Sequence, residues 1–297
     1  MSGITARRHR FQVPAELDGE RLDRVVAGQI DELSRRRARV VIDLGGVFVD
    51  GKRVKVASRP MRTGQQVEVV VGGALERATK KVGSAARRRD DRRLPDHRIV
   101  FQDEHLAVVF KPAGLLTAPT PESDRGNLAD LLGRELGSVF VVHRLDLPTS
   151  GILVFARTNQ CNQALGELFR VHDVDRRYRV VVEGYWPAEL VRIDVPVAGK
   201  EAVTEIEVIE RIGDRATVLQ ATLHTGRTHQ IRVHVSGSGH PVAGDRRYGG
   251  KTLRPPQMAL HATRLGFRHP VTGESLCFDE PIPVDLDRWL SDLRGAG

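Results

Sequence analysis

The spacing of apolar residues predicts two helices near the start of the chain. Over residues 22–44 they recur every three or four positions, as on one face of an amphipathic helix. Ser34 separates the two stretches as an N-cap, and Gly45 ends the second one. Residues 47–54 then predict a hairpin with an Asp-Gly turn, and residues 66–71 predict a strand. The apolar positions of the two helices are Leu22, Val25, Val26, Ile30, Leu33, Ala38, Val41, Ile42 and Leu44.

A second pattern begins near Arg98, where the apolar segments are shorter and are often interrupted by polar residues. Residues 98–111 predict two strands around an Asp-Glu turn, and residues 128–136 and 159–170 predict helices. Several later segments predict further strands. Because these strands are not regularly alternated by helices, we expect an α+β fold with a mixed, largely antiparallel sheet. The later strand segments are 178–183, 203–210, 216–224 and 229–235.

Charge divides the chain at the same place. Residues 1–98 contain 23 Lys and Arg against 13 Asp and Glu, a net charge of +10, while residues 99–297 contain 23 against 25, a net charge of −2. The chain is also longer than a typical single domain. We therefore expect a small basic domain over 1–71, a basic flexible linker over 72–97 and a larger domain over 98–297. A basic module joined to a near-neutral body is typical of a protein that binds a polyanion such as RNA.

Other features narrow the class of protein. No run approaches 18 consecutive apolar residues and the first residues include no apolar signal segment, so we expect neither a membrane span nor secretion. The two cysteines, Cys161 and Cys277, have no partner motif nearby, which favours a reducing cytoplasm. Four histidines lie between residues 224 and 240, but their spacing fits no metal-binding motif. We therefore expect no metal site.

The second predicted helix begins SRRRAR, which places Arg35, Arg36 and Arg39 on a shared outer face. Arginines at an exposed helix N-terminus offer charged side chains and free N–H groups to phosphates. We therefore expect these three residues to bind RNA. The helix-helix-hairpin order over about residues 20–71 resembles the alpha-L RNA-binding domain, named for ribosomal protein S four, and the resemblance implies the same function.

An aspartate and an arginine that are far apart in the sequence form the candidate chemistry of the larger domain. Asp146 lies in HRLDLPTSG, a tight loop before the apolar run GILVFA, where a rigid scaffold can fix a carboxylate. Arg232 lies among apolar neighbours in the predicted strand 229–235, and residues 215–244 contain no carboxylate. A buried arginine needs a partner, and we expect Asp146 to supply it. A guanidinium in this position would favour the ionised carboxylate.

Several motifs in the larger domain follow the order of one family. HRLDLPTSGILVFA at 143–156 resembles the signature of the RluA family of RNA pseudouridine synthases. Further motifs extend the resemblance over most of residues 98–285. Arg176 stands where the family usually has lysine, Val180 stands where alanine is common, and the histidine often found after KPAG is absent. The further motifs are KPAG at 111–114, RRYRVVVEG at 176–184, HTGRTHQIRVH at 224–234, GHPVAGDRRYG at 239–249 and LHATRLGFRHPVTGE at 260–274.

The resemblance implies an enzyme that isomerises uridine in RNA to pseudouridine. It places Asp146 at the nucleophile position and Tyr178 at the position of the active-site tyrosine, which would stack on uracil and could help to remove the C5 proton. The target nucleotide must leave its stack, and Arg144 would help to hold the RNA open. Gln230, on the same predicted strand face as Arg232, is a further candidate for RNA binding. No cofactor is implied, and we expect a monomer.

With the alpha-L module in front, the chain resembles the branch of the family that acts on large-subunit ribosomal RNA. Transfer RNA is an alternative substrate. A binding-only ribosome assembly factor is an alternative function, although the intact Asp146, Tyr178 and Arg232 argue against it. A metal-dependent nuclease would need clustered carboxylates, which the motif regions lack.

Overall fold

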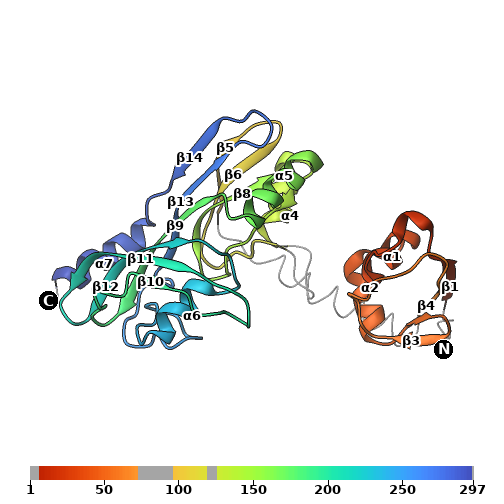
Figure 1. Cartoon of the computed structure of the whole chain (residues 1–297), viewed down its shortest axis with the longest axis horizontal. Coiled ribbons are helices and arrows are strands. Elements are labelled where there is room, and N and C mark those ends of the chain that lie inside the picture. The colour runs from red at the N-terminus through yellow and green to blue at the C-terminus, as the bar shows by residue number, and fades with distance from the viewer. Residues whose placement is uncertain (1–6, 73–95, 119–125, 296–297) are drawn as a thin grey trace. The chain divides into compact units, whose positions relative to one another are not determined.

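The computed structural model describes residues 7–72, 96–118 and 126–295, and these form two compact units (Figure 1). The first unit holds residues 7–72, and nearly all the other described residues belong to the second. Each unit has hydrophobic core residues of its own. Most of the predicted basic linker lies in residues 73–95, outside the described residues.

The first unit combines a four-stranded antiparallel sheet with two helices. Its elements are β1 (Arg7–Gln12), η1 (Ala15–Leu17), α1 (Leu22–Gln29), α2 (Arg35–Asp43), β2 (Val47–Val49), β3 (Lys52–Val54) and β4 (Gln66–Val71). The strand order is β1-β4-β2-β3, and residues of both helices share one core with the sheet. Ser34 caps α2 as predicted, because its side chain accepts a hydrogen bond from the backbone N–H of Arg37. The predicted helices, hairpin and final strand are confirmed, whereas the sequence pattern did not predict β1.

The second unit is built on a ten-stranded sheet. Its strands are β5 (Arg98–Gln102), β6 (Leu106–Lys111), β7 (Phe140–Val141), β8 (Ser150–Ala156), β9 (Asp175–Glu183), β10 (Arg192–Ile193), β11 (Thr204–Ile212), β12 (Ala216–Leu223), β13 (Leu260–Arg268) and β14 (Ser275–Asp279). Its helices are α4 (Leu128–Leu136), α5 (Asn159–Arg170), α6 (Gln230–Gly237) and α7 (Val284–Gly295). Among the described strand pairs, only β13 with β8 is parallel. The α+β fold with a largely antiparallel sheet is therefore confirmed.

The sheet consists of two sets of strands joined by one late strand (Figure 1). The order is β10-β11-β12-β9-β13-β8-β6-β5, with β14 on β13 and β7 on β8. One set is β10-β11-β12-β9 and the other is β8-β6-β5. Strand β13 lies between β9 and β8, so it joins two sets of strands that both precede it in the chain. Strand β8 is buried along its whole length, which explains the apolar run GILVFA. Helix α5 contacts β8, and α6 contacts β11.

The predicted strand over residues 229–235 is wrong, because residues 230–237 form helix α6. Its isoleucine and two valines are β-branched, which favours a strand when the segment is considered alone. In the fold, the helix also buries Gln230, Arg232 and His234, and each of these polar side chains has hydrogen-bond partners. These tertiary contacts outweigh the strand propensity of the segment.

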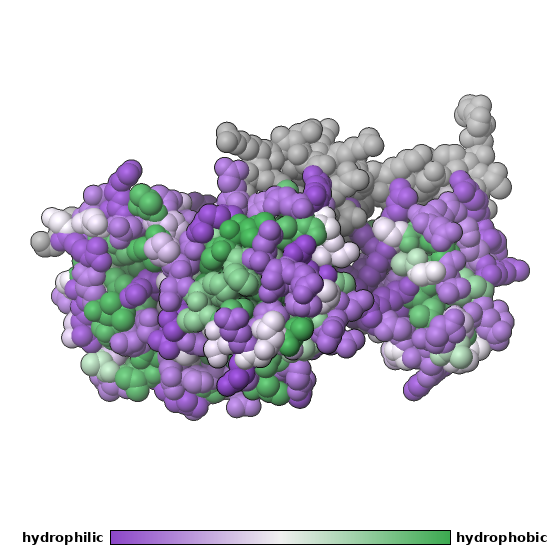
Figure 2. Space-filling view, turned by 90° about the horizontal axis from the view of Figure 1, so that it is seen from above, coloured by the Kyte–Doolittle hydropathy of each residue, from purple (hydrophilic) through white to green (hydrophobic). Residues whose placement is uncertain are grey.

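On each unit, the face seen in Figure 2 is largely hydrophilic, with hydrophobic patches among the hydrophilic residues. Among the described helices, none has both the length and the apolar composition to cross a membrane.

Candidate active site

A cleft of about 430 Å³ lies in the second unit, where segments far apart in the sequence meet. It is lined by residues within 142–149, 169–178 and 223–232, together with Leu260. The structure therefore brings five of the sequence candidates together. These are Arg144, Asp146, Tyr178, Gln230 and Arg232. The three arginine candidates of α2 belong to the first unit.

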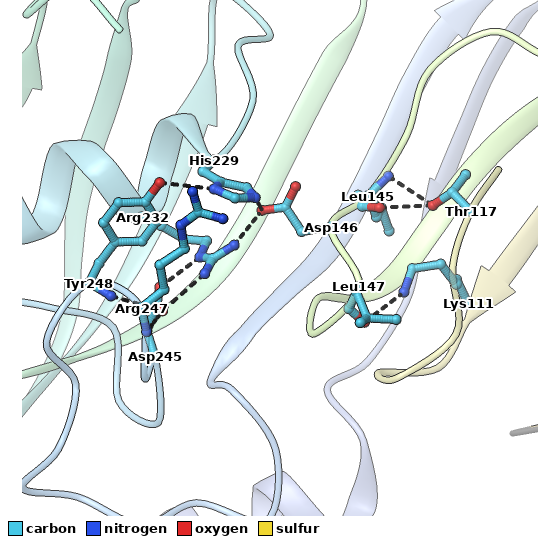
Figure 3. A network of polar contacts seen from close by, with 10 residues as sticks. All are labelled: Lys111, Thr117, Leu145, Asp146, Leu147, His229, Arg232, Asp245, Arg247 and Tyr248. Carbon is cyan, nitrogen blue, oxygen red and sulfur yellow. Dashed lines mark hydrogen bonds and ion pairs between the residues drawn. The ribbon is translucent and has the colours of Figure 1, made fainter. Parts of the chain in front are cut away.

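The loop that carries Asp146 is held in place by the last residue of β6 and by a residue shortly after this strand (Figure 3). The buried Lys111 donates from Nζ to the backbone carbonyl of Leu147 at 3.4 Å. The Thr117 hydroxyl donates to the carbonyl of Leu145 at 2.8 Å and accepts from its N–H at 3.2 Å. Both neighbours of Asp146 are thus fixed through their backbones, so the carboxylate has a defined position at the edge of the cleft.

Arg232 on α6 joins two carboxylates (Figure 3). Its Nη1 donates to Asp146 Oδ2 at 3.0 Å, so the ion pair expected from the sequence is confirmed. Its Nε and Nη2 donate to Asp245 Oδ2 and Oδ1 at 2.6 and 3.0 Å. Sequence reasoning missed Asp245, which follows directly after the carboxylate-free stretch 215–244. The bidentate contact fixes the plane of the guanidinium and directs its remaining nitrogen at Asp146.

Arg232 and Asp245 stabilise each other in their charged forms. Burial disfavours the charged form of Arg232, but hydrogen bonds to Asp245 and Asp146 outweigh it and raise the pKa of the guanidinium. Burial also disfavours the ionised form of Asp245, but Arg232 and backbone N–H groups outweigh it and lower the pKa of this carboxyl. Among the described residues, none donates a hydrogen bond to Oδ1 of Asp146. That oxygen is therefore available to a substrate.

His229 lies beside the ion pair, and sequence reasoning did not assign it a role. Its Nε2 is 3.7 Å from Asp146 Oδ2, and its Nδ1 is 2.9 Å from the hydroxyl of Tyr248. Burial lowers the pKa of His229, with the charge of Asp146 acting in the opposite direction. Its φ of 59° is in the left-handed region, which is costly for a residue other than glycine. The Tyr248 ring covers Arg232, whose guanidinium carbon is 5.0 Å from the ring centre.

Tyr178 reaches the cleft from β9. In the sheet register its neighbours on β12 and β13 are Ala221 and Ala262, and Tyr178 itself, which is 8% exposed, lines the cleft. Burial raises the pKa of Tyr178; Arg176 lowers it and Asp146 raises it further. The phenol is therefore protonated at neutral pH.

The other two cleft candidates differ in their surroundings. Arg144 is exposed at the cleft, where an RNA strand could reach its side chain. Gln230 is buried, and its amide donates to the Val203 carbonyl and the Thr204 hydroxyl. Its carbonyl oxygen accepts from the Thr225 hydroxyl and from a backbone N–H. The polar atoms of Gln230 are thus engaged within the protein.

The arginines of α2 are partly engaged as well. The fully buried carboxylate of Asp23 accepts hydrogen bonds from Nε of Arg35 at 3.1 Å and Nε of Arg39 at 2.6 Å. Arg21 also binds this carboxylate. Burial alone would raise the pKa of Asp23, but the three arginines lower it to about 2. Both α2 arginines remain partly exposed, so part of each guanidinium is still accessible.

The histidines considered for metal binding have separate protein partners. Each histidine interacts with a different group of the protein. These separate contacts explain the positions of the four side chains without a metal ion that they would bind together. The pairs are His224 with Glu205, His229 with Tyr248, His234 with Thr204 and His240 with the Glu183 carbonyl. In the part of the chain that the structure describes, no group of three or more His, Cys, Asp or Glu could hold a metal ion.

Known proteins resemble both units. Residues 105–237 match the family described as RNA pseudouridylate synthase, and residues 20–67 match the S4 domain. An uncharacterized RNA pseudouridine synthase of Aquifex aeolicus (strain VF5) is 34% identical over 318 residues, which cover 95% of this chain and 97% of that protein. Ribosomal large subunit pseudouridine synthase D of Xanthomonas campestris pv. campestris is 36% identical over 315 residues, covering 95% and 91%. The solved structure of human RNA pseudouridylate synthase domain containing 4 has a TM-score of 0.55 at 22% identity, covers 73% of this chain and 98% of that chain, and supports the fold alone.

Proposed function

The chain belongs to the RNA pseudouridine synthase family, and on this premise we propose that it modifies uridines of large-subunit ribosomal RNA with Asp146 as the nucleophile. In this reaction the bond from N1 of uracil to C1′ of the ribose breaks, and the uracil turns. C5 then becomes bonded to C1′ and loses its proton, while N1 gains one. A carboxylate supports such a rearrangement by trapping one half of the nucleotide covalently while the base turns.

One observation carries the assignment of Asp146. Its Oδ2 is fixed by Arg232, and its Oδ1 accepts no hydrogen bond from the described residues lining the cleft. The fixed oxygen orients the carboxylate, and the other oxygen can approach a nucleotide. The ionised carboxylate is the form that can attack, and Nη1 of Arg232 lies 3.0 Å from it.

Tyr178 and Arg144 support a nucleotide that has left its stack. Tyr178 lines the cleft, and we assign its ring to stacking on uracil. Because burial raises the pKa of its phenol, we do not assign Tyr178 the role of a base. The exposed Arg144 is suited to hold the surrounding RNA open while the target uridine occupies the cleft.

Two features favour ribosomal RNA as the substrate. The relatives from Xanthomonas campestris and Neisseria meningitidis are named ribosomal large subunit pseudouridine synthase D, and the first unit matches the S4 domain. The alternative substrate is transfer RNA. Mapping of pseudouridine in both RNA classes from a strain that lacks this protein would decide between them, since only the true substrate should lose a modified site.

The protein is proposed to act as a monomer in the cytoplasm. Both cysteines, Cys161 and Cys277, are free. Free thiols are typical of a reducing compartment.

Replacement of Asp146 tests the proposed function. Asp146→Asn is nearly isosteric, so the fold and the affinity for RNA should remain, while pseudouridine formation should fall by at least about a thousandfold because an amide is a poor nucleophile. Release of tritium from RNA labelled at uridine C5 measures each turnover directly. Asp214→Asn, in an exposed turn, is the matched control and should release tritium at the rate of the unchanged protein.

A substantial rate in Asp146→Asn would exclude Asp146 as the nucleophile. If the unchanged protein bound ribosomal RNA but released no tritium, the alternative of a binding-only assembly factor would be favoured.

A further inference from the structure

Arg176 is a buried arginine that the mechanism does not use. It lies on β9 and is 7% exposed. Its guanidinium carbon is 5.5 Å from the centre of the Phe169 ring, and its Nη2 makes a 3.4 Å contact with the Leu223 carbonyl. Its Nε is buried without a hydrogen-bond partner. In the described parts of the chain, no carboxylate forms an ion pair with Arg176.

This arrangement leaves a positive charge without compensation. An arginine remains charged in proteins, and a buried charge is unfavourable unless it is paired. Burial accordingly lowers the pKa of Arg176. Arg232, in the same cleft, shows the usual arrangement, since two carboxylates contact it. An anion brought by a ligand would supply what Arg176 lacks.

The surroundings of Arg176 match a phosphate. Arg227 and His172 line the same cleft, and burial together with the charges of Arg176 and Arg227 lowers the pKa of His172, while Glu201 acts in the opposite direction. A Cβ on Gly226 would lie 2.8 Å from Nη1 of Arg176, so glycine at this position lets the guanidinium pack closely against the backbone at residue 226. Positive and N–H-donating groups thus gather at one part of the cleft.

The position of Arg176 relative to Tyr178 agrees with this interpretation. The two residues are two positions apart on β9, so both side chains are on the face of the strand that meets the cleft. Their Cα atoms are about 7 Å apart along the strand. A nucleotide whose uracil stacks on Tyr178 could therefore place its own backbone near Arg176.

We propose that Arg176 binds the RNA phosphate adjoining the target uridine, with Arg227 and His172 beside it. This proposal rests on the proposed function, because it takes the uridine in the cleft as its starting point. The planar guanidinium suits the two oxygens of a phosphate, and a full negative charge compensates it better than a neutral uracil carbonyl would.

Substitution of Arg176 in the full chain tests the proposal with a transcript of large-subunit ribosomal RNA as the probe. Arg176→Met should flatten the slope of log affinity against log salt by roughly 0.7–0.9, the effect of one bound phosphate, while Arg176→Lys should keep the slope. In the turnover assay, Arg176→Met should raise KM roughly tenfold and leave kcat nearly unchanged, because the phosphate is bound equally before and during the chemical step.

Arg211→Met is a matched control. Arg211 on β11 also lies over an aromatic ring, with its guanidinium carbon 4.7 Å from the Tyr185 ring centre, and its Nε is also buried without a hydrogen-bond partner. It does not line the cleft. Its substitution should change neither the salt slope nor KM.

The outcomes separate the proposal from its alternatives. An unchanged salt slope in Arg176→Met would overturn it, as would a fall in kcat at constant KM, which would indicate contact with the uracil. A lower melting temperature with an unchanged slope would show that Arg176 serves only the fold. The salt slope does not depend on turnover, so it remains decisive even if the proposed function fails.

Discussion

At Arg232, the donors of one guanidinium are divided between two carboxylates. Two nitrogens bind Asp245 and a third binds Asp146. Asp245 is 1% exposed and cannot exchange this contact for water, so it holds the guanidinium in one orientation. A lysine at this position would provide one point charge and could not reproduce the planar contact with both partners. The position of Asp146, the proposed nucleophile, therefore depends on Asp245, which acts through Arg232 and need not touch the substrate.

Lys111 gives the protein a predicted pH dependence of stability. Its buried Nζ donates to three backbone carbonyls, and burial lowers its pKa from 10.5 to about 7, with Asp146 acting in the opposite direction. Between these two values the unfolded chain holds a proton on Lys111 that the folded protein lacks. The free energy of unfolding should therefore rise with pH across this window, by up to about 1.4 kcal/mol per pH unit from this group.

Lys111→Met should lack this rise, which chemical denaturation at a series of pH values would measure against the unchanged protein. Lys200→Met removes an exposed lysine of the same unit and should keep the rise. An equal pH dependence in Lys111→Met and the unchanged protein would mean that Lys111 does not titrate in this window.

Asp23 changes how the arginines of α2 should be tested for RNA binding. Because Arg35 and Arg39 bind its buried carboxylate, their replacement by serine would also leave a buried charge with fewer partners. Weaker RNA binding in such a variant would combine weaker attraction for phosphates with a less stable first unit. Lysine in their place would preserve the positive charges and so separate the two effects.

At the scale of elements, the sequence predicted those whose pattern is set by local contacts. The helices at 128–136 and 159–170 have the predicted bounds, and Ser34 caps α2. Helix α6 could not be predicted in this way, because its β-branched residues favour a strand and distant contacts stabilise the helix. Asp146 was predicted correctly as a partner of Arg232, because that expectation depended on the charge of a buried arginine and not on the secondary structure, whereas its second partner, Asp245, was missed.

Gly151 tests the connection between the two sets of strands. Its φ is +122°, and an added Cβ would lie 2.4 Å from the backbone N and O of Ala262 on β13. Gly151→Ala should therefore lower the free energy of unfolding by on the order of 2–4 kcal/mol through strain and overpacking. Turnover should also fall, because Gly151 lies directly after the loop that carries Asp146. Thermal denaturation and tritium release measure the two effects.

The control for this substitution is Gly166→Ala on α5, where an added Cβ would have no atom within 4 Å. Alanine is the better helix former, so this variant should gain roughly 0.5–1 kcal/mol in stability. A stable Gly151→Ala variant would show that β8 and β13 can separate without loss of the fold.

At the scale of the whole molecule, the excess positive charge and the cleft lie in different parts of the chain. The cleft lies in the second unit, whereas residues 1–98 carry a net charge of +10. A fragment that begins at residue 96 should keep its own core and release tritium from a short stem-loop RNA. It should bind long RNA more weakly and with a shallower salt slope, by roughly 0.7–0.9 for each phosphate that it no longer binds. Filter binding at several salt concentrations, compared with the full chain, measures the difference.

Equal salt slopes for the fragment and the full chain would mean that the basic residues before residue 96 bind no phosphates. The charge asymmetry would then have to be explained by another partner.

The place of β13 in the sheet has a consequence for the order of folding. Asp146 precedes β8, and Arg232 follows β12, so the two residues belong to the sets of strands on opposite sides of β13. During synthesis, both sets leave the ribosome before β13, which ends at Arg268. The sets can form their local hairpins early, but their union requires a strand from near the end of the chain. We therefore expect the ion pair at the cleft to form among the last contacts, so that a nascent chain could not modify RNA before its synthesis is nearly complete.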